Sequence, residues 1–586
     1  MRTFIILGIF MVNIHSLPAQ KLVPADFSFR TLIADSTDSL TSSNNMRSNV
    51  VTEIILQTDS TIWLGTGLGV SIISVIGDSF NIETIPDTID LVEDTNPTIL
   101  TNRLPKGGIS AMDVSGQGNV VFVAVAGSEN DIPVGKGLVI TTNATDSDIS
   151  WDYYDQPIDA AGKDTITWGG LRFKYGALPI TVTQANVTYD VAIGERFVWI
   201  ASWAGGLRRL GYNSEIPIWE RVPLPLDNQF ELTTCEDSSY VRVWYDDGSF
   251  IDVLKDYVLN PRDPIDGGNH NHKTFSVMVY GDTIWVGTAN GINRGIINPD
   301  VTTGFCIDWK HYSYPTDGLS GNFVVGLALQ MYKGKRIIWA ATVNADDPTE
   351  QRGVSYSAND GLSWNSTLLG ERVYNITAHD SLVFAATASG LWKTEDGINW
   401  ARYSRVKQDI HVQNTTIHNT DEVLANEVYS VAFDTSSFWI EVDGSQQDRN
   451  SIWIGTGDGV AHSYDLDGRN WKIFRAEYDK DEDYAYPNPF SPYTHNVIGG
   501  DGYVRFHTNE WSGTFVIDFD IYNFALEKVF AGSFDRRVAS SGALKWNGRD
   551  TQGRLVNNGV YFVKLTYPEN QTSKPSPHWV KLIVVK

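Results

Sequence analysis

The chain is poor in cysteine and in positive charge. Only Cys235 and Cys306 occur among 586 residues, so disulfides cannot be the main support of so long a chain. An exported protein allows these two to pair, but sequence does not show whether they come within bridging distance. Lys and Arg number 45 against 70 Asp and Glu, a formal net charge of −25. This excess of negative charge argues against nucleic acid or anionic lipid as a partner.

Long hydrophobic runs are also missing, because no apolar stretch approaches the ~20 residues of a comfortable membrane span. The most apolar segment, Thr3 to Ile14, follows Met1-Arg2 and precedes small residues near Ala19. This order predicts a signal peptide over residues 1–20. We therefore expect a secreted or outer-surface protein with no membrane span after the signal is removed.

Glycine and aromatic residues are plentiful, with 51 Gly and 19 Trp. Such a composition favours many short strands and tight turns over long helices. The length exceeds what one ordinary core of ~100–200 residues needs, which predicts more than one domain.

One short frame recurs along the chain: aliphatic, aromatic, aliphatic, small, then usually Thr. It appears seven times, at Ile62–Thr66, Val121–Val125, Val198–Ser202, Ile284–Thr288, Ile338–Thr342, Val383–Thr387 and Ile452–Thr456. A Gly-aliphatic pair follows each copy, beginning with Gly69-Val70, and indicates a hairpin turn into another strand. An alternating apolar strand precedes each copy, and a last strand carrying Trp follows all but the first.

Each unit is thus four short strands, and a lone sheet of this kind cannot bury both apolar faces. Seven such sheets around an axis can do so, while a β-helix would need much shorter rungs. We predict a seven-bladed β-propeller over residues 26–478. The Gly or Ala in each frame would leave room for the neighbouring blade, and Phe27–Ile33 is a weaker candidate for a ring-closing strand.

Two families share parts of this repeat. Asp317-Gly318-Leu319-Ser320-Gly321-Asn322-Phe323-Val324 resembles the repeat of two-component-regulator propellers. Ser357-Ala358-Asn359-Asp360-Gly361-Leu362-Ser363-Trp364 resembles the Asp-box of sialidase-type propellers. Lys393–Trp400 and Tyr464–Trp471 are weaker copies, with Glu395 and Leu466 where the Asp of the box would stand. These resemblances imply a propeller fold, but the Asp-box is structural and does not imply hydrolysis.

A second domain is predicted over residues 484–586. The charged segment Lys480–Asp483 and the prolines of Tyr486–Pro492 mark the boundary, because closely spaced prolines cannot sit in a central strand. Alternating runs then return at Tyr503–Phe506, Phe515–Ile521, Lys528–Phe530, Val560–Leu565 and Val580–Val585. They predict a small antiparallel β-sandwich.

This tail carries two resemblances. Trp546-Asn547-Gly548-Arg549-Asp550-Thr551-Gln552-Gly553 and Gly559-Val560-Tyr561-Phe562 resemble the Ig-like domain of flagellar hook-capping proteins, with Arg549 and Asp550 in a tight turn. The layout also resembles the C-terminal sorting domain of type IX secretion substrates. The second resemblance implies a role in export or surface attachment through the export machinery, and the first a plain structural module.

Motifs for catalysis or metal binding are weak. Gly65-Thr66-Gly67-Leu68-Gly69 looks like a phosphate loop but recurs as a blade hairpin. His270-Asn271-His272, near Asp263 and Asp266, is a candidate metal cluster that we interpret as polar loop residues. Asp465-x-Asp467-Gly468 lacks the closing Glu of a calcium loop, and we interpret it as a self-braced turn. We predict no metal, no cofactor and no catalytic residues.

Other polar residues are candidates for a site because of their position in the repeat and not because of a motif. A sialidase needs an arginine cluster, for which Arg208, Arg209 and Arg294 are candidates, but we expect them to cover blade edges in solvent. Four residues that precede strands are expected near the mouth of the ring: Asn49, Lys273, Asn322 and Asn426.

The function that these features favour is a secreted, non-enzymatic binding or scaffold propeller. Its ligand, an unidentified protein or glycan, would use the mouth of the ring or the insertions at 152–186 and 222–273. One alternative is a sialidase-like hydrolase or lyase acting on glycans. The other is a sensory input module, which would need a separate partner because the chain has no kinase-like segment.

Overall fold

A computed structural model gives the arrangement of most of the chain. It describes residues 46–586 except residues 59, 77–78, 90–98, 130–131, 160–164, 169–170, 176–185, 214–217, 236–239, 246, 255, 258–269, 299–305, 346, 404–405, 413–414, 424, 435–439, 443–444, 448–449, 464–465, 469–470, 477–482, 487, 494–501, 509–515, 536–543 and 569–576. The predicted signal peptide and the strand predicted at Phe27–Ile33 lie outside the described residues. No helix in the described part is long and apolar enough to cross a membrane.

The described regular elements are β-strands, apart from one 3₁₀ turn, η1 (His270–His272), so the all-β prediction is confirmed. Seven antiparallel sheets repeat one strand order. Sheet 1 is β1 (Val51–Thr58), β2 (Thr61–Thr66), β3 (Gly69–Ile76) and β4 (Ser79–Ile85). Sheet 2 is β6 (Gly108–Val114), β7 (Val121–Glu129), β8 (Ile132–Thr141), β9 (Ser150–Tyr154) and β5 (Ile99–Thr101). Sheet 3 is β12 (Thr188–Ile193), β13 (Val198–Ser202), β14 (Gly206–Leu210) and β15 (Trp219–Arg221).

The remaining four sheets follow the same pattern. Sheet 4 is β20 (Thr274–Tyr280), β21 (Thr283–Thr288), β22 (Gly291–Ile297), β23 (Ile307–Tyr312) and β16 (Glu231–Thr233). Sheet 5 is β24 (Phe323–Tyr332), β25 (Lys335–Val343), β26 (Gly353–Ser357) and β27 (Asn365–Thr367). Sheet 6 is β28 (Val373–His379), β29 (Leu382–Thr387), β30 (Gly390–Thr394) and β31 (Ala401–Arg402). Sheet 7 is β34 (Val428–Asp434), β37 (Ser451–Thr456), β38 (Gly459–Ser463) and β39 (Lys472–Phe474). Every repeated frame lies in the second strand of its sheet.

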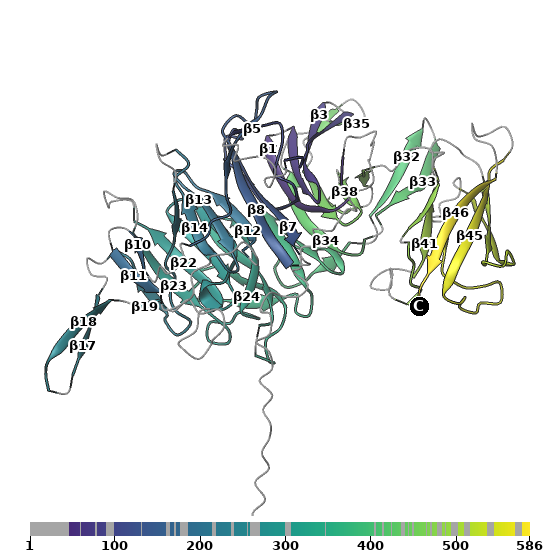
Figure 1. The fold of residues 1–586 in the computed structure, drawn as a ribbon. Helices are drawn as coiled ribbons and strands as arrows, with labels where there is room; N and C mark the ends of the chain where they lie inside the picture. The colour runs from purple at the N-terminus through teal and green to yellow at the C-terminus, as the bar shows by residue number, and fades with distance from the viewer. Residues whose placement is uncertain are drawn as a thin grey trace, which may run out of the picture.

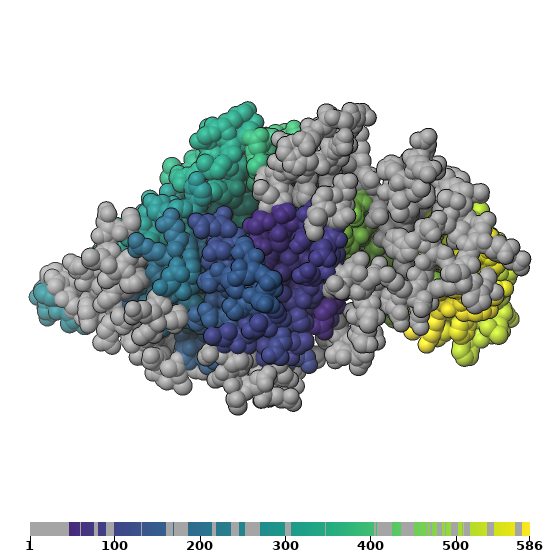
Figure 2. Space-filling model, turned by 90° about the horizontal axis from the view of Figure 1, so that it is seen from above, coloured from purple at the N-terminus to yellow at the C-terminus, as the bar shows by residue number. Residues whose placement is uncertain are grey.

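The seven sheets close into a ring. The first strand of each sheet contacts the first strands of the sheets before and after it, and β34 of the last sheet contacts β1 of the first. In Figure 2 the first sheets follow one another in colour order across the visible face. Asn49 joins the two ends, because its Nδ2 donates to the Ala476 carbonyl at 3.2 Å and its Oδ1 accepts the Ala476 N–H at 2.7 Å.

Aromatic pairs hold neighbouring sheets together. At four junctions the frame aromatic of one sheet packs edge-on against the outer Trp of the next, as in Trp63–Trp151, whose ring centroids are 6.0 Å apart. Sheet 1 lacks an outer Trp, and Phe80 of β4 takes that place against Trp453 of sheet 7 at 6.1 Å. Sheet 1, which is the copy of the repeat without an outer Trp, therefore still packs an aromatic side chain against its neighbour.

The Gly of the frame lets the neighbouring sheet approach closely, as the sequence predicted. A Cβ at Gly455 would lie 2.6 Å from the Val51 carbonyl oxygen of sheet 1, which is too close for a real contact. The hairpin glycine is also explained, since Gly69 has a φ of +82°.

The outer Trp is not always inside the last strand, which corrects the prediction for sheets 5 to 7. Trp364, Trp400 and Trp471 each stand immediately before the strand. The Asp-box-like turn requires this position, because the Trp closes the turn. In the second copy Asp396, not Glu395, braces the turn: its Oδ1 accepts the N–H groups of Ile398 at 2.8 Å and Asn399 at 2.7 Å.

The insertions form small sheets outside the ring. They are β10 (Thr165–Trp168), β11 (Leu171–Tyr175) and β19 (Asp256–Tyr257); β17 (Tyr240–Trp244) and β18 (Phe250–Leu254); β32 (Lys407–Val412) and β33 (Thr415–Glu422); and β35 (Ile440–Val442) and β36 (Ser445–Gln447). Figure 1 shows the β17–β18 hairpin projecting from the ring. Cys235, just after β16, is disulfide-bonded to Cys306, just before β23, so the open question of their pairing is answered.

The tail contains two antiparallel sheets over one core. One sheet is β40 (Tyr484–Tyr486), β41 (Val504–His507) and β44 (Lys545–Trp546), and the other is β43 (Lys528–Asp535), β42 (Val516–Tyr522), β45 (Gly559–Thr566) and β46 (His578–Val584). Phe506 and Trp546 from the first sheet pack in the same buried cluster as Phe519 from the second. The predicted turn is present, with Asp550 Oδ1 accepting the Arg554 N–H at 2.9 Å.

Candidate functional site

A cavity of about 720 Å³ lies on the axis of the ring. It is lined by residues of the first strands of all seven sheets, β1, β6, β12, β20, β24, β28 and β34. A volume of this size is typical of a ligand pocket. The ring closure therefore creates a site to which every sheet contributes.

The same irregularity occurs in each of these seven strands. The pairing register between the first and second strand shifts by one residue, as it does at a β-bulge. The residues left out of the ladder are Thr52, Ser110, Tyr189, Phe275, Val325, Tyr374 and Tyr429, and all seven line the cavity. A bulge re-aims a side chain, so one position of the repeat becomes a ring of side chains around the axis.

Four of these bulge residues are aromatic, and we call Tyr189, Phe275, Tyr374 and Tyr429 the aromatic collar. Tyr189 and Phe275 have ring centroids 5.5 Å apart, and Tyr374 and Tyr429 have theirs 5.6 Å apart. Glu427 accepts hydrogen bonds from the hydroxyls of Tyr429 at 2.8 Å and Tyr374 at 3.4 Å. The Arg372 guanidinium lies 5.3 Å from the centre of the Tyr374 ring.

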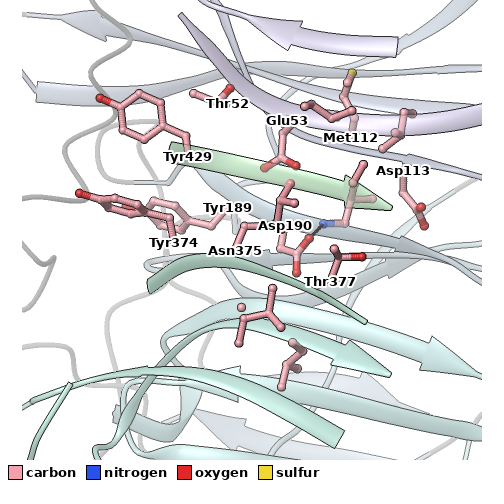
Figure 3. Close-up of a pocket in the computed structure, with 18 of the residues that line it drawn as sticks. Thr52, Glu53, Met112, Asp113, Tyr189, Asp190, Tyr374, Asn375, Thr377 and Tyr429 are labelled. Carbon is pink, nitrogen blue, oxygen red and sulfur yellow. Dashed lines mark hydrogen bonds between the residues drawn. The ribbon is translucent and has the colours of Figure 1, made fainter. Parts of the chain in front are cut away.

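Farther along the strands the wall carries carboxylates (Figure 3). Asp113 Oδ2 accepts the Ile193 N–H of the next sheet at 2.6 Å, and Asp190 Oδ2 accepts the Val277 N–H of the sheet after it at 2.8 Å. Burial raises the pKa of Asp113 to about 6, although these N–H groups oppose the shift. Burial, with a smaller contribution from the charge of Asp113, raises the pKa of Asp190 to about 7.

Glu53 is the third carboxylate of this group. Figure 3 shows its side chain directed toward the space that Asp190 also faces. Burial raises the pKa of Glu53 well above its usual range, and the charges of Asp190 and then Asp113 raise it further. The charge of Asp113 therefore raises the pKa of both other carboxylates, and the charge of Asp190 raises the pKa of Glu53.

The residues expected at the mouth of the ring do not line this cavity. Asn49 is occupied in closing the ring, and Asn322 Nδ2 donates to Glu350 Oε1 at 3.2 Å. Lys273 is buried, with its Nζ 5.7 Å from the centre of the Trp203 ring. Asn426 is also absent from the lining, although the next residue, Glu427, belongs to it. The side chains of Asn49 and Asn322 therefore stabilise contacts of the segments just before β1 and β24.

The three candidate arginines do not form one cluster, and the expectation that they lie in solvent is wrong for two of them. Arg208 and Arg221 share the carboxylate of Asp159, at 3.0 and 2.6 Å. Arg209 is fully buried, stacks 3.9 Å from the centre of the Trp168 ring, and pairs with Glu220 at 2.9 Å. Asp159 and Trp168, both from the insertion that follows β9, therefore help to cover the two arginines.

Arg294 belongs to another sheet. Its guanidinium lies 5.8 Å from the centre of the Trp285 ring in the same sheet. No carboxylate-binding arginine trio therefore exists among Arg208, Arg209 and Arg294.

The candidate metal residues are split between described and undescribed parts of the chain. Asp263, Asp266 and Asp465 lie outside the described residues. His270 and His272 are buried in η1, and burial lowers the pKa of His272 to about 3. Asp467 lies 3.6 Å from Lys393 Nζ. In the described part of the chain no group of three or more His, Cys, Asp or Glu could hold a metal ion.

Sequence reasoning missed the collar and the carboxylates. Alignment of the repeats on the frame would have placed Tyr189, Phe275 and Tyr374 at one position, two residues before a shared aliphatic, whereas the longer segment before Ile452 displaces Tyr429. The signal for Asp113 and Asp190 is weaker, because an acidic residue within an apolar strand is the only clue, and the two stand at different positions of the repeat.

No family model and no curated protein matches the chain. Among solved structures it is similar to PorZ, an essential bacterial surface component of the type-IX secretion system of Porphyromonas gingivalis, at 14% identity over 90% of this chain, with a TM-score of 0.29. The chain spans 64% of the length of PorZ. It is also similar to BamB from Moraxella catarrhalis (10% identity, 71% of this chain and 96% of that one, TM-score 0.32).

A third similar structure is the extracellular domain of the putative one component system BT4673 from B. thetaiotaomicron. It has 13% identity, covers 93% of this chain and 82% of that one, and gives a TM-score of 0.20. TM-scores this low add nothing to the architecture that the strand pairing defines.

Proposed function

We propose that the protein is a secreted, non-enzymatic binding or scaffold module, built as a seven-bladed β-propeller over residues 26–478 with an Ig-like domain over 484–586. The observation that carries this proposal is the axial cavity, because all seven sheets supply its wall and their bulges direct side chains into it. The aromatic collar gives it a rim of large, rigid side chains, which are favoured at binding surfaces.

A non-enzymatic role agrees with the placement of the polar groups. Asp113 and Asp190 are fixed by backbone N–H groups of neighbouring sheets, and Arg208 and Arg209 by local acidic and aromatic partners. Such groups act as structural links. The sialidase-like alternative has no supporting cluster among the arginines that were its candidates.

Photo-crosslinking tests where a partner binds. A photoreactive phenylalanine replaces Tyr374 in the collar, and the matched control replaces Tyr280, an exposed tyrosine at the end of β20. With cell-surface or culture-medium material, adducts are expected from position 374 and not from position 280. Equal adducts from both positions, or none from position 374, would contradict binding at the cavity.

The tail is proposed to serve export or surface attachment. Its two sheets enclose a core of their own, so it has the physical basis of a separate domain. The full chain should reach the cell surface or medium, whereas a chain ending at Asp483 should remain in the cell envelope with the thermal unfolding of its ring unchanged. Equal export of the two chains would contradict a role of the tail in export.

A further inference from the structure

The charges that line the axial cavity are unbalanced. Among the described residues that line it, the ionisable side chains, tyrosines aside, are Glu53, Asp113, Asp190 and Glu427 against the single cation Arg372. Arg372 lies by Tyr374 in the collar, at the level where Glu427 binds the tyrosine hydroxyls. The three deeper carboxylates therefore have no cation of the cavity wall beside them.

Their hydrogen bonds do not replace a cation. Asp113 and Asp190 accept N–H groups of the backbone, including those of Val114 and Val191 at 2.8 Å each. These bonds fix the two carboxylates in the wall. Among the described residues the side chain of Glu53 has neither a hydrogen-bond partner nor an ion-pair partner. An enclosed carboxylate without a partner is costly, and a ligand cation would remove that cost.

The order of groups along the strands matches one kind of ligand. The collar comes first, at the bulges of β12, β20, β28 and β34, and the carboxylates lie farther along (Figure 3). Apolar side chains such as Ile55, Val191 and Ile193, which follow Glu53 and Asp190 in their strands, also line the wall. Aromatic faces attract cations, and an apolar wall suits a methylene stem.

We propose that the cavity binds an alkyl ammonium or guanidinium group, such as the side chain of a lysine or arginine presented by a partner, which passes the aromatic collar and places its charge beside Glu53 and Asp190. This rests on the proposed function, because it names the ligand class of the same cavity. The described acidic side chains are not placed to hold a metal ion together, which favours an organic cation.

Calorimetry with the full chain tests the ligand class. The probes are the blocked peptide Gly-Ser-Lys-Ser-Gly, the same peptide with the lysine acetylated, and 1,5-diaminopentane, at about pH 8, which is above the pKa of Asp113 and of Asp190. The lysine peptide or the diamine should bind at least about tenfold more tightly than the acetylated peptide, because acetylation removes the charge. The peptide and diamine arms distinguish a side chain of a partner from a free amine.

Two variants locate the binding. Glu53→Gln should weaken binding of the cationic probes about fivefold or more, and Asp190→Asn should do the same. The control Asp247→Asn removes one exposed charge from the projecting hairpin and should leave binding unchanged. Thermal unfolding checks that each variant is folded.

Some outcomes would overturn the inference. They are equal binding of the acetylated peptide, equal weakening by Asp247→Asn, or no binding of either cationic probe. If no cation binds while crosslinking at position 374 still captures a partner, the proposed function stands and only the ligand class is wrong. If crosslinking fails as well, both are wrong.

Discussion

The carboxylate of Asp113 in β6 accepts the backbone N–H of Ile193 in β12 at 2.6 Å, and so links two neighbouring sheets at the wall of the axial cavity. Asp190 repeats the link one sheet farther, to Val277 in β20 at 2.8 Å. These acidic side chains both hold sheets together and give the cavity its charge. Their enclosure has a consequence for stability that can be measured.

The contribution of Asp190 to stability should fall as the pH rises from about 4 to about 7. Burial raises the pKa of Asp190 in the folded protein to about 7, above its ordinary 3.8. A group with a raised folded pKa stabilises the fold while it is protonated, and that contribution is lost as the pH passes the folded pKa. Asp190→Asn should raise the free energy of unfolding at pH 8, by about 1–2 kcal/mol after allowance for partial solvation, and change it little at about pH 4.

Urea unfolding at the two pH values checks this expectation. Glu53 and Asp113 titrate in the same direction, so the variant removes only part of the pH dependence. Replacement of the exposed Asp518 by Asn is the matched control and should leave the pH dependence as it is. Equal destabilisation by Asp190→Asn at both pH values would contradict the account.

Phe80→Ala should weaken the closure of the ring. Phe80 contacts the rings of Trp453 at 6.1 Å and Phe474 at 5.0 Å, both in sheet 7. Loss of a half-buried aromatic should lower the free energy of unfolding by about 2 kcal/mol, measured by urea unfolding. Phe524→Ala, at a side chain that is 76% exposed, should have little effect. Similar losses for both variants would mean that Phe80 does not join the sheets.

Gly455→Ala should be destabilising although the same frame position is Ala in other sheets. The added Cβ would lie 2.6 Å from the carbonyl oxygen of Val51 and also meet Ser430 Oγ, so sheets 7 and 1 must separate. Overpacking of this kind costs about 1–3 kcal/mol. The opposite exchange, Ala386→Gly in sheet 6, should not force any sheets apart. A melting temperature unchanged by Gly455→Ala would show that the contact between sheets 7 and 1 accommodates the added methyl group, and it would contradict this prediction.

Reduction of the disulfide should destabilise sheet 4. The bond ties β16 to the outer edge of the sheet and closes a segment with a sequence separation of 71 residues. Its loss should cost about 2–4 kcal/mol. Dithiothreitol should therefore lower the melting temperature of the native protein, while the double variant Cys235→Ser, Cys306→Ser should melt at that lower temperature with or without it. A melting temperature that does not respond to reductant would contradict this.

Most of the fold could be predicted from patterns in short stretches of the sequence. The frame around Trp63 predicts a buried strand and Gly69 predicts the turn after it, because alternation and positive φ depend on residues close in sequence. Seven repetitions of that pattern predict repeated sheets, and they do so without any knowledge of contacts between sheets. The two antiparallel sheets of the tail were predictable for the same reason, from their alternating strands.

What the sequence by itself determined, then, is the all-β class, the repeated four-strand unit and the turn residues. The tertiary structure decided which distant residues meet: Cys235 with Cys306, Phe80 with Trp453, and Asp113 with Ile193. It also decided that Arg209 is buried and that the bulge side chains surround one cavity. The physical reason is that register shifts and contacts between sheets depend on how all seven sheets close, and no short stretch of sequence contains that information.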